Sequence, residues 1–169
     1  RYEKKNPQDA YENGFVYLLA DEFTNHNEVP LGQKTVKLLN QLGYGVQIPK
    51  GIVTGRSFIS KGMLIEAKAL ANSNVDQLGS LISYEHPLLG IEPSAILTFR
   101  DEIPSLVDAE KREQAEQLKP NCLLLDEFIA REFKAGKITS DSFHGKQQKI
   151  LLHGHCHQKS IAGLTSTRI

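Results

Sequence analysis

Short apolar runs alternate along the chain with segments whose apolar residues recur at helical spacing. The runs are typical of strands buried on both faces of a sheet, and they cover residues 15–20, 44–49, 87–91 and 149–152. Helical spacing between the runs predicts helices over residues 31–42, 60–82, 94–99 and 122–133, and a charged, exposed helical turn over residues 108–119. Gly43 and Gly136 are placed to end two of these helices, and Ser94 is placed to cap another.

Strands and helices that alternate through short connections favour parallel strand pairing. The predicted fold class is therefore α/β, a three-layer domain with a mainly parallel four-stranded sheet flanked by helices. We expect residues 1–14 to be a polar lead-in and residues 15–169 to be a single domain. We also expect this domain to have been excised from a larger protein and to be truncated at its C-terminal end.

The carboxyl ends of parallel strands are where ligands collect in such sheets. The predicted strands bring four polar loops to that edge, at residues 21–26, 51–56, 92–95 and 153–157. The topology thus predicts a candidate site before any motif is considered.

Charge and cysteine content narrow the classes of partner. Twenty basic residues balance twenty acidic ones, so no overall field favours nucleic acid. No apolar run approaches the length of a transmembrane helix, and the two cysteines do not indicate a disulfide framework. We expect a cytoplasmic protein, in which Cys122 is a small core residue on a helix.

The segment at residues 153–159 reads HGHCHQK and is rich in metal-ligating side chains. One interpretation is a mononuclear metal site formed by His153 or His155 with Cys156, Asp21 and Glu92. The alternative is that the histidines form hydrogen bonds at the edge of the sheet. In an extended backbone, side chains alternate, so the three histidines would lie on the face opposite Cys156.

Three other features allow more than one interpretation. Cys156 with a histidine and Asp21 or Glu92 is a weak nucleophilic triad, because Cys156 lacks a nucleophile-elbow context. Residues 51–57 form either a phosphate-binding loop with Arg56 or an ordinary turn. The run at residues 100–102, Arg-Asp-Glu, is either a solvated helix face or part of a buried ion pair.

Four segments in the same order resemble the cysteine-rich CCG domain. They are residues 20–25 (ADEFTN), 54–62 (TGRSFISKG), 89–102 (LGIEPSAILTFRDE) and 153–159 (HGHCHQK). CCG domains form the C-terminal region of FAD-linked, iron–sulfur oxidoreductases of the glycolate oxidase and D-lactate dehydrogenase type. Related domains occur in heterodisulfide reductase subunits. The resemblance extends from about residue 15 to residue 163.

The chain departs from this pattern at the cluster ligands. The paired cysteines of the motif are replaced by Val53 and Thr54, and the cysteine of the EPSC motif by Ala95, so only Cys156 remains. One thiolate is too few for an iron–sulfur cluster, which typically takes four cysteines. Residues of similar size would keep the fold.

The resemblance implies a domain of an FAD-linked iron–sulfur oxidoreductase acting on a small D-2-hydroxy acid, of lactate or glycolate type. FAD and a 4Fe-4S cluster are expected in the parent protein, the partners are its other domains, and no cofactor or catalysis is expected in this fragment. The alternatives are a degenerate docking or small-anion-binding module and a mononuclear metal site. The candidate edge residues are Asp21, Thr24, Thr54, Gly55, Arg56, Glu92 and Ser94, with Cys156 and His155 as remnant metal positions.

Overall fold

A four-stranded, wholly parallel sheet forms the centre of the molecule. The structure, a computed structural model, describes residues 11–145 and 149–168. The sheet order is β2-β1-β3-β4, with β1 pairing in parallel with both β2 and β3, and β3 with β4. The strands are β1 (Phe15–Leu18), β2 (Gly45–Gln47), β3 (Leu88–Gly90) and β4 (Cys122–Leu124).

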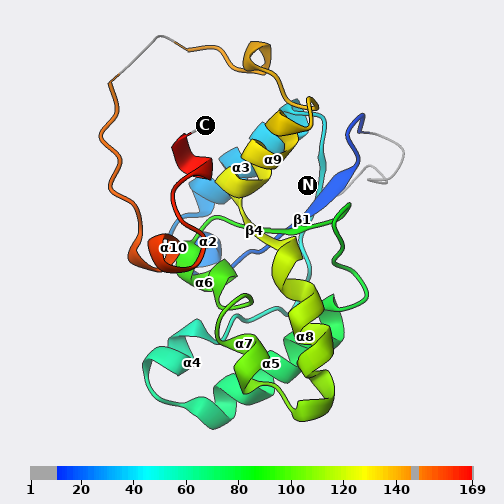
Figure 1. The fold of residues 1–169 in the computed structure, drawn as a ribbon, viewed down its shortest axis with the longest axis vertical. Helices are drawn as coiled ribbons and strands as arrows, with labels where there is room; N and C mark the ends of the chain where they lie inside the picture. Colours follow the sequence, from blue (N-terminus) through cyan, green and yellow to red (C-terminus); the bar gives the residue numbers. More distant parts are fainter. Residues whose placement is uncertain (1–10, 146–148, 169) are drawn as a thin grey trace.

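Helices cover both faces of this sheet (Figure 1). On one face lie α3 (Val29–Gln41) and α9 (Leu125–Lys134), and the other face carries α5 (Leu64–Leu78), α7 (Ile103–Leu106) and α8 (Arg112–Leu118). Shorter helices follow the strands or end the chain: α2 (Glu22–His26), α4 (Arg56–Ser60), α6 (Pro93–Leu97) and α10 (Cys156–Ile161). Single 3₁₀ turns lie at Ala109–Lys111, Lys119–Asn121, Ser140–Ser142 and Ser166–Arg168.

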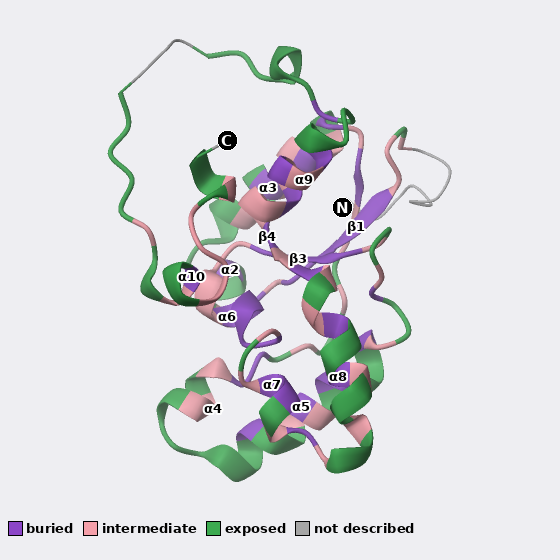
Figure 2. Cartoon of the chain, in the orientation of Figure 1, coloured by how far each residue is buried: buried purple, intermediate pink, exposed green. Residues whose placement is uncertain are grey.

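The alternation of side chains along β1 divides the core into two parts. Phe15, Tyr17 and Leu19 pack with residues of α5 to α8, whereas Val16 and Leu18 pack with residues of α3 and α9. A strand that contacts helices on both faces has no polar side, which explains the continuous apolar run in the sequence. Figure 2 shows the buried residues gathered along the strands and the inner faces of the helices. The predicted three-layer α/β fold is confirmed.

The prediction of the fourth strand was wrong. Residues 149–152 are not in a strand; they form part of an extended segment outside the sheet (Figures 1 and 2). The fourth strand is instead β4, whose first residue, Cys122, is predicted by its spacing to lie in a helix. The spacing of Cys122, Leu125 and Ile129 fits a helix, but residues 122–125 are also a continuous apolar run, and its first three residues pair with β3.

Two details of the predicted helices also differ. The helix predicted over residues 60–82 is shorter, Leu64–Leu78: Ser60 instead ends α4, and Gly62, with a φ of 73°, separates α4 from α5. The side chain that caps α6 belongs to Glu92 rather than to Ser94, and it accepts the backbone N–H of Ala95 at 2.5 Å. Gly43 and Gly136 both adopt positive φ after the preceding helices, as predicted. Of the predicted lead-in, residues 1–10 lie outside the described part of the chain.

Gly90 provides a stability prediction at the end of β3. A Cβ atom built on Gly90 would lie 2.3 Å from the Cβ of Ile96, a residue that is fully buried in α6. We therefore expect Gly90→Ala to lower the free energy of unfolding by about 1–3 kcal/mol, the range for overpacking a core. Urea denaturation measures this. Gly145→Ala is a control, because nothing lies within 4 Å of the position that its Cβ would take; equal stability for the two variants would contradict the close packing.

Candidate site at the carboxyl edge of the sheet

The loop after β1 places Asp21 at the start of α2. Asp21 is 1% exposed and caps the helix, since one carboxylate oxygen accepts the backbone N–H groups of Phe23 and Thr24 at 2.9 and 3.1 Å. The other oxygen accepts the hydroxyl of Thr24 at 2.5 Å. Asp21 and Thr24, two of the predicted edge residues, therefore lie together, and both are engaged in holding this turn.

The loop after β2 brings Thr54, Gly55 and Arg56 to the same edge. Thr54 is buried, accepts the backbone N–H of Arg56 at 3.3 Å and donates to a Glu22 carboxylate oxygen at 3.4 Å. Gly55 adopts a φ of 79°, which a residue with a side chain rarely takes, and precedes the first residue of α4. Contact between Thr54 and Glu22 joins the loops that follow β1 and β2.

A turn after α6 joins three separate parts of the molecule. Arg100 pairs with Glu127 of α9 at 2.7 Å, Glu102 pairs with Arg56, and Asp101 lies 3.5 Å from the Nε2 atom of His157. Residues 100–102 thus combine the two interpretations: Arg100 forms an ion pair, which is half-buried rather than buried, and Asp101 is exposed. The guanidinium of Arg56 is matched by a carboxylate, which reduces its capacity to attract an anion.

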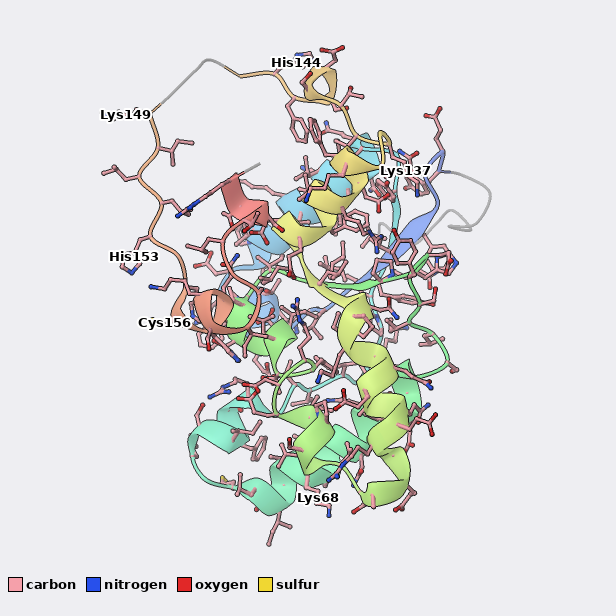
Figure 3. The ribbon with its side chains drawn as sticks, in the orientation of Figure 1. Lys68, Lys137, His144, Lys149, His153 and Cys156 are labelled. Atoms are coloured by element: carbon pink, nitrogen blue, oxygen red, sulfur yellow. The ribbon has the colours of Figure 1, made fainter. Side chains whose placement is uncertain are left out.

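The histidine-rich segment contributes a helix start to this edge. His155 precedes α10 and accepts the backbone N–H of His157 through Nδ1 at 3.3 Å. The predicted alternation of side chains therefore ends at Cys156, the first residue of the helix. Cys156 is exposed, and Figure 3 shows it with His153 at the outer side of the molecule. Helix α10 packs against α6, and its buried Gln158 donates to Asp126 of α9 at 3.0 Å.

The two cysteines lie in different environments. Cys122 is fully buried in β4, and burial raises the pKa of its thiol to about 12, so it is a protonated core residue at neutral pH. The chain therefore has one exposed thiol, that of Cys156. Because a 4Fe-4S cluster takes four cysteine thiolates, the residues present do not fit this group. Thr54 and Ala95, which stand where the CCG pattern has cysteine, are buried without sulfur.

The residues that we proposed for a mononuclear metal site do not form the closest group of metal-ligating atoms. Among the described residues, the ligand atoms that lie within 4.8 Å of one another belong to Asp101, Glu102 and His157. This group does not include Asp21, Glu92, His155 or Cys156. Glu102 already pairs with Arg56, so this group is part of the ion-pair network.

Sequence analysis found the loops of this edge but missed their partners. Glu22, Glu127 and His157 complete the contacts described above. Glu22 and His157 lie in the predicted loops without being among the candidate edge residues, and Glu127 lies outside those loops. Glu127 carries a local signal, because an acidic residue in the first helical turn can accept backbone N–H groups, as it does from Leu124 at 2.9 Å. Its pairing with Arg100 depends on the tertiary fold.

Asp21 gives a second stability prediction. Asp21→Ala removes the acceptor of two backbone N–H groups and one hydroxyl, so we expect the free energy of unfolding to fall by about 2 kcal/mol. Asp21→Asn retains a capping oxygen and should lose less than half of that. Thermal and urea unfolding of the three proteins measure the difference; an equal loss for both variants would show that the cap is not the source of the effect.

Comparison with known proteins gives relatives over most of the chain. The chain is 24% identical over 162 residues to the C subunit of anaerobic glycerol-3-phosphate dehydrogenase from Escherichia coli (strain K12), a match that covers 95% of this chain and 39% of that protein. It is 23% identical over 141 residues to D-2-hydroxyglutarate dehydrogenase of the same strain, covering 83% of this chain and 13% of that protein. These relatives are dehydrogenases.

A third relative agrees with these two. D-2-hydroxyglutarate dehydrogenase of Pseudomonas putida is 29% identical over 99 residues, covering 57% of this chain and 10% of that protein. No family model and no solved structure matches the chain. The chain thus spans less than half the length of each of these relatives. No helix among the described residues has both the length and the apolar character needed to cross a membrane.

Proposed function

We propose that this chain is an accessory domain of a larger FAD-linked, iron–sulfur dehydrogenase of the cytoplasm, and that it does not itself catalyse the reaction. The observation that carries the proposal is the match of 95% of the chain to 39% of one dehydrogenase subunit, together with the match to a second dehydrogenase. A domain that corresponds to part of two oxidoreductases is best explained as a shared module of such proteins. The order of the four CCG-like segments supports the same module.

The proposed substrate of the parent protein is a small hydroxylated anion. The names of the relatives give glycerol-3-phosphate and D-2-hydroxyglutarate, which both carry an alcohol group and negative charge. Lactate and glycolate, suggested by the CCG resemblance, belong to the same class. We therefore propose small hydroxylated anions as the class of substrate, and these four compounds are the ones to be tested.

The residues at the edge of the sheet support an accessory role. Asp21 and Glu92 cap helices, Arg56 pairs with Glu102, and Arg100 pairs with Glu127, so these charged groups already have partners within the domain. We propose that this network holds the loops that a cluster would otherwise join. FAD and the 4Fe-4S cluster would then be bound by other parts of the parent protein.

A docking role for the domain is favoured by one further observation. Ile150, Leu151 and Leu152 are 80%, 93% and 49% exposed in the extended segment before α10. Three consecutive aliphatic side chains in water form a surface that is stabilised when another surface covers it. We propose that other domains of the parent protein cover these residues. The docking role is thus compatible with the accessory role.

Isolation of the native protein tests the proposal. A tag on this chain in its natural source is used to purify the whole polypeptide or complex, which is assayed for acid-released flavin and for dye reduction with the four hydroxylated anions. We expect flavin and the oxidation of at least one compound, whereas the 169-residue chain alone should give neither. A native protein without flavin and without activity on all four would contradict the proposal, as would activity of the isolated chain.

A further inference from the structure

A group of three metal-ligating side chains lies where α10 meets the turn after α6. Asp101 and Glu102 belong to this turn, which leads into α7, and His157 is the second residue of α10. Helix α10 packs against α6, and Figure 1 shows the two helices side by side. The ligand atoms of the three residues all lie within 4.8 Å of one another, so the fold brings together groups that are distant in the sequence.

The distance between Asp101 and His157 fits two ligands of one ion. Oδ2 of Asp101 lies 3.5 Å from Nε2 of His157, which is longer than the roughly 2.7–3.2 Å of an N–H···O hydrogen bond. Two ligand atoms of a tetrahedral zinc ion lie about 3.4 Å apart, because each is bonded to the metal at about 2.0–2.2 Å. The side chain of Asp101 is 48% exposed, so it can move to bring all three ligands to this distance.

Glu102 has one oxygen that its neighbours leave without a hydrogen bond. Oε1 pairs with Arg56, whereas Oε2 is buried and accepts no hydrogen bond from the described residues. Such an acceptor is costly, and a cation beside it would remove the cost. Its lack of contact with water is compatible with an ion site, because a hydrogen-bonded water needs about 2.8 Å to each oxygen, whereas zinc needs only about 2.0–2.2 Å.

The charges of the group favour a divalent cation, since two carboxylates and one neutral imidazole supply two negative charges. Carboxylate oxygen and imidazole nitrogen are zinc ligands, and Arg56 would hold Glu102 in place as the outer hydrogen-bond partner that such ligands usually have. We propose that Asp101, Glu102 and His157 bind one zinc ion, with water in the fourth position. The ion would attach α10 to the turn after α6. The site uses no cysteine and does not depend on the proposed dehydrogenase function.

Titration of the 169-residue chain with Zn²⁺ tests the site. The protein is first freed of metal and then titrated in competition with a chromophoric chelator. We expect one Zn²⁺ per chain, with a micromolar or lower dissociation constant. Loss of the hydrogen-bond partner of a ligand typically costs about 10- to 100-fold in metal affinity, so loss of a ligand in Asp101→Ala or His157→Ala should weaken binding by at least about a hundredfold.

Two matched controls and a second metal locate the ion. His153→Ala removes an exposed histidine of the same segment, Asp141→Ala removes another exposed carboxylate, and both should leave the dissociation constant unchanged. With Co²⁺ in place of Zn²⁺, the absorption spectrum should lack a thiolate-to-metal charge-transfer band, because Cys156 is not among the three ligands. Far-UV circular dichroism verifies that each variant is folded.

The inference is overturned if the chain binds no zinc at micromolar concentration, or if folded Asp101→Ala and His157→Ala bind it as tightly as the wild-type chain. Equal weakening by His153→Ala and His157→Ala, or a thiolate band in the Co²⁺ spectrum, would indicate an ion held by the exposed histidines and Cys156, and would overturn it as well. If a variant does not fold, the stoichiometry and the Co²⁺ spectrum of the wild-type chain still decide the question.

Discussion

Replacing Glu132 with alanine should lower the free energy of unfolding by about 3–5 kcal/mol, the cost of removing one partner from a buried charged pair. Glu132 is 3% exposed and binds three groups: the hydroxyl of Tyr44 at 2.6 Å, Nε of Arg131 at 2.7 Å and Nζ of Lys137 at 3.2 Å. Without Glu132, the buried hydroxyl of Tyr44 loses its acceptor, and Arg131 loses its carboxylate. The urea midpoint should fall with little change in the slope of the transition.

A control and a partner variant separate this network from a general effect of lost charge. Glu113 is an exposed residue of α8, and Glu113→Ala should change stability by less than about 0.5 kcal/mol. Tyr44→Phe in the Glu132→Ala background should cost less than Tyr44→Phe alone, because the hydroxyl then has no partner to lose. Equal losses for Glu132→Ala and Glu113→Ala would contradict the role of the network.

The same network predicts how stability depends on pH. Burial disfavours ionisation of Glu132, but hydrogen bonds from Tyr44, Arg131 and Lys137 outweigh it, so the pKa of Glu132 lies below its ordinary value of 4.5. Around pH 4.5, the unfolded state therefore binds more protons than the folded state. The stabilisation is fully present above that pH and is lost as pH falls below it towards the folded pKa. As the pH falls through this window, the free energy of unfolding of Glu132→Gln should decline less steeply than that of the wild-type chain. An equal decline in the two proteins would contradict the assignment of the pH dependence to Glu132.

The second large effect is expected at Phe128. This residue is fully buried in α9, and its ring packs edge-on against Tyr44, with 5.0 Å between the ring centroids. Phe128→Ala should destabilise the fold by about 3–5 kcal/mol through lost burial and the resulting cavity. Phe133 belongs to the same helix but is 42% exposed, so Phe133→Ala should cost less than about 1.5 kcal/mol. Urea denaturation of both variants measures the difference.

The comparison of these two phenylalanines also tests the orientation of α9. If Phe133→Ala were as damaging as Phe128→Ala, the helix would have to present a different face to the sheet. The apolar spacing of Leu125, Ile129 and Phe133 places Phe133 on the buried stripe of the predicted helix, whereas in the structure Phe128 is buried and Phe133 is 42% exposed. Unfolding data on this pair therefore test a feature that the sequence pattern predicts wrongly.

The parallel sheet could be predicted from the sequence because its central strands are continuous apolar runs between helices. The run at residues 15–20 lies in and beside β1, which has neighbours on both sides. Residues 149–152 have the same apolar character, yet they are exposed. Apolar character measures the tendency to be buried but does not specify the surface that buries a residue, and β4 takes the fourth position in the sheet.

The candidate site could be predicted as a place rather than as a set of contacts. Asp21, Thr54 and Glu92 follow predicted strands, and the parallel topology alone collects their loops at one edge. The pairing of Arg56 with Glu102 joins residues 46 positions apart, and that of Arg100 with Glu127 joins residues 27 positions apart. Spacing along the chain carries no signal for such contacts, because the fold between the partners determines their separation.

We propose that side-chain caps and ion pairs of this chain, rather than an iron–sulfur cluster, hold the loops at the carboxyl edge of the sheet. Iron and acid-labile sulfide, measured on the 169-residue chain purified without oxygen or chelator, test it most directly. We predict far less than one atom of either per chain, in a protein that is folded and that unfolds cooperatively. About four iron and four sulfide atoms per chain, lost together with the fold on chelation, would contradict the claim.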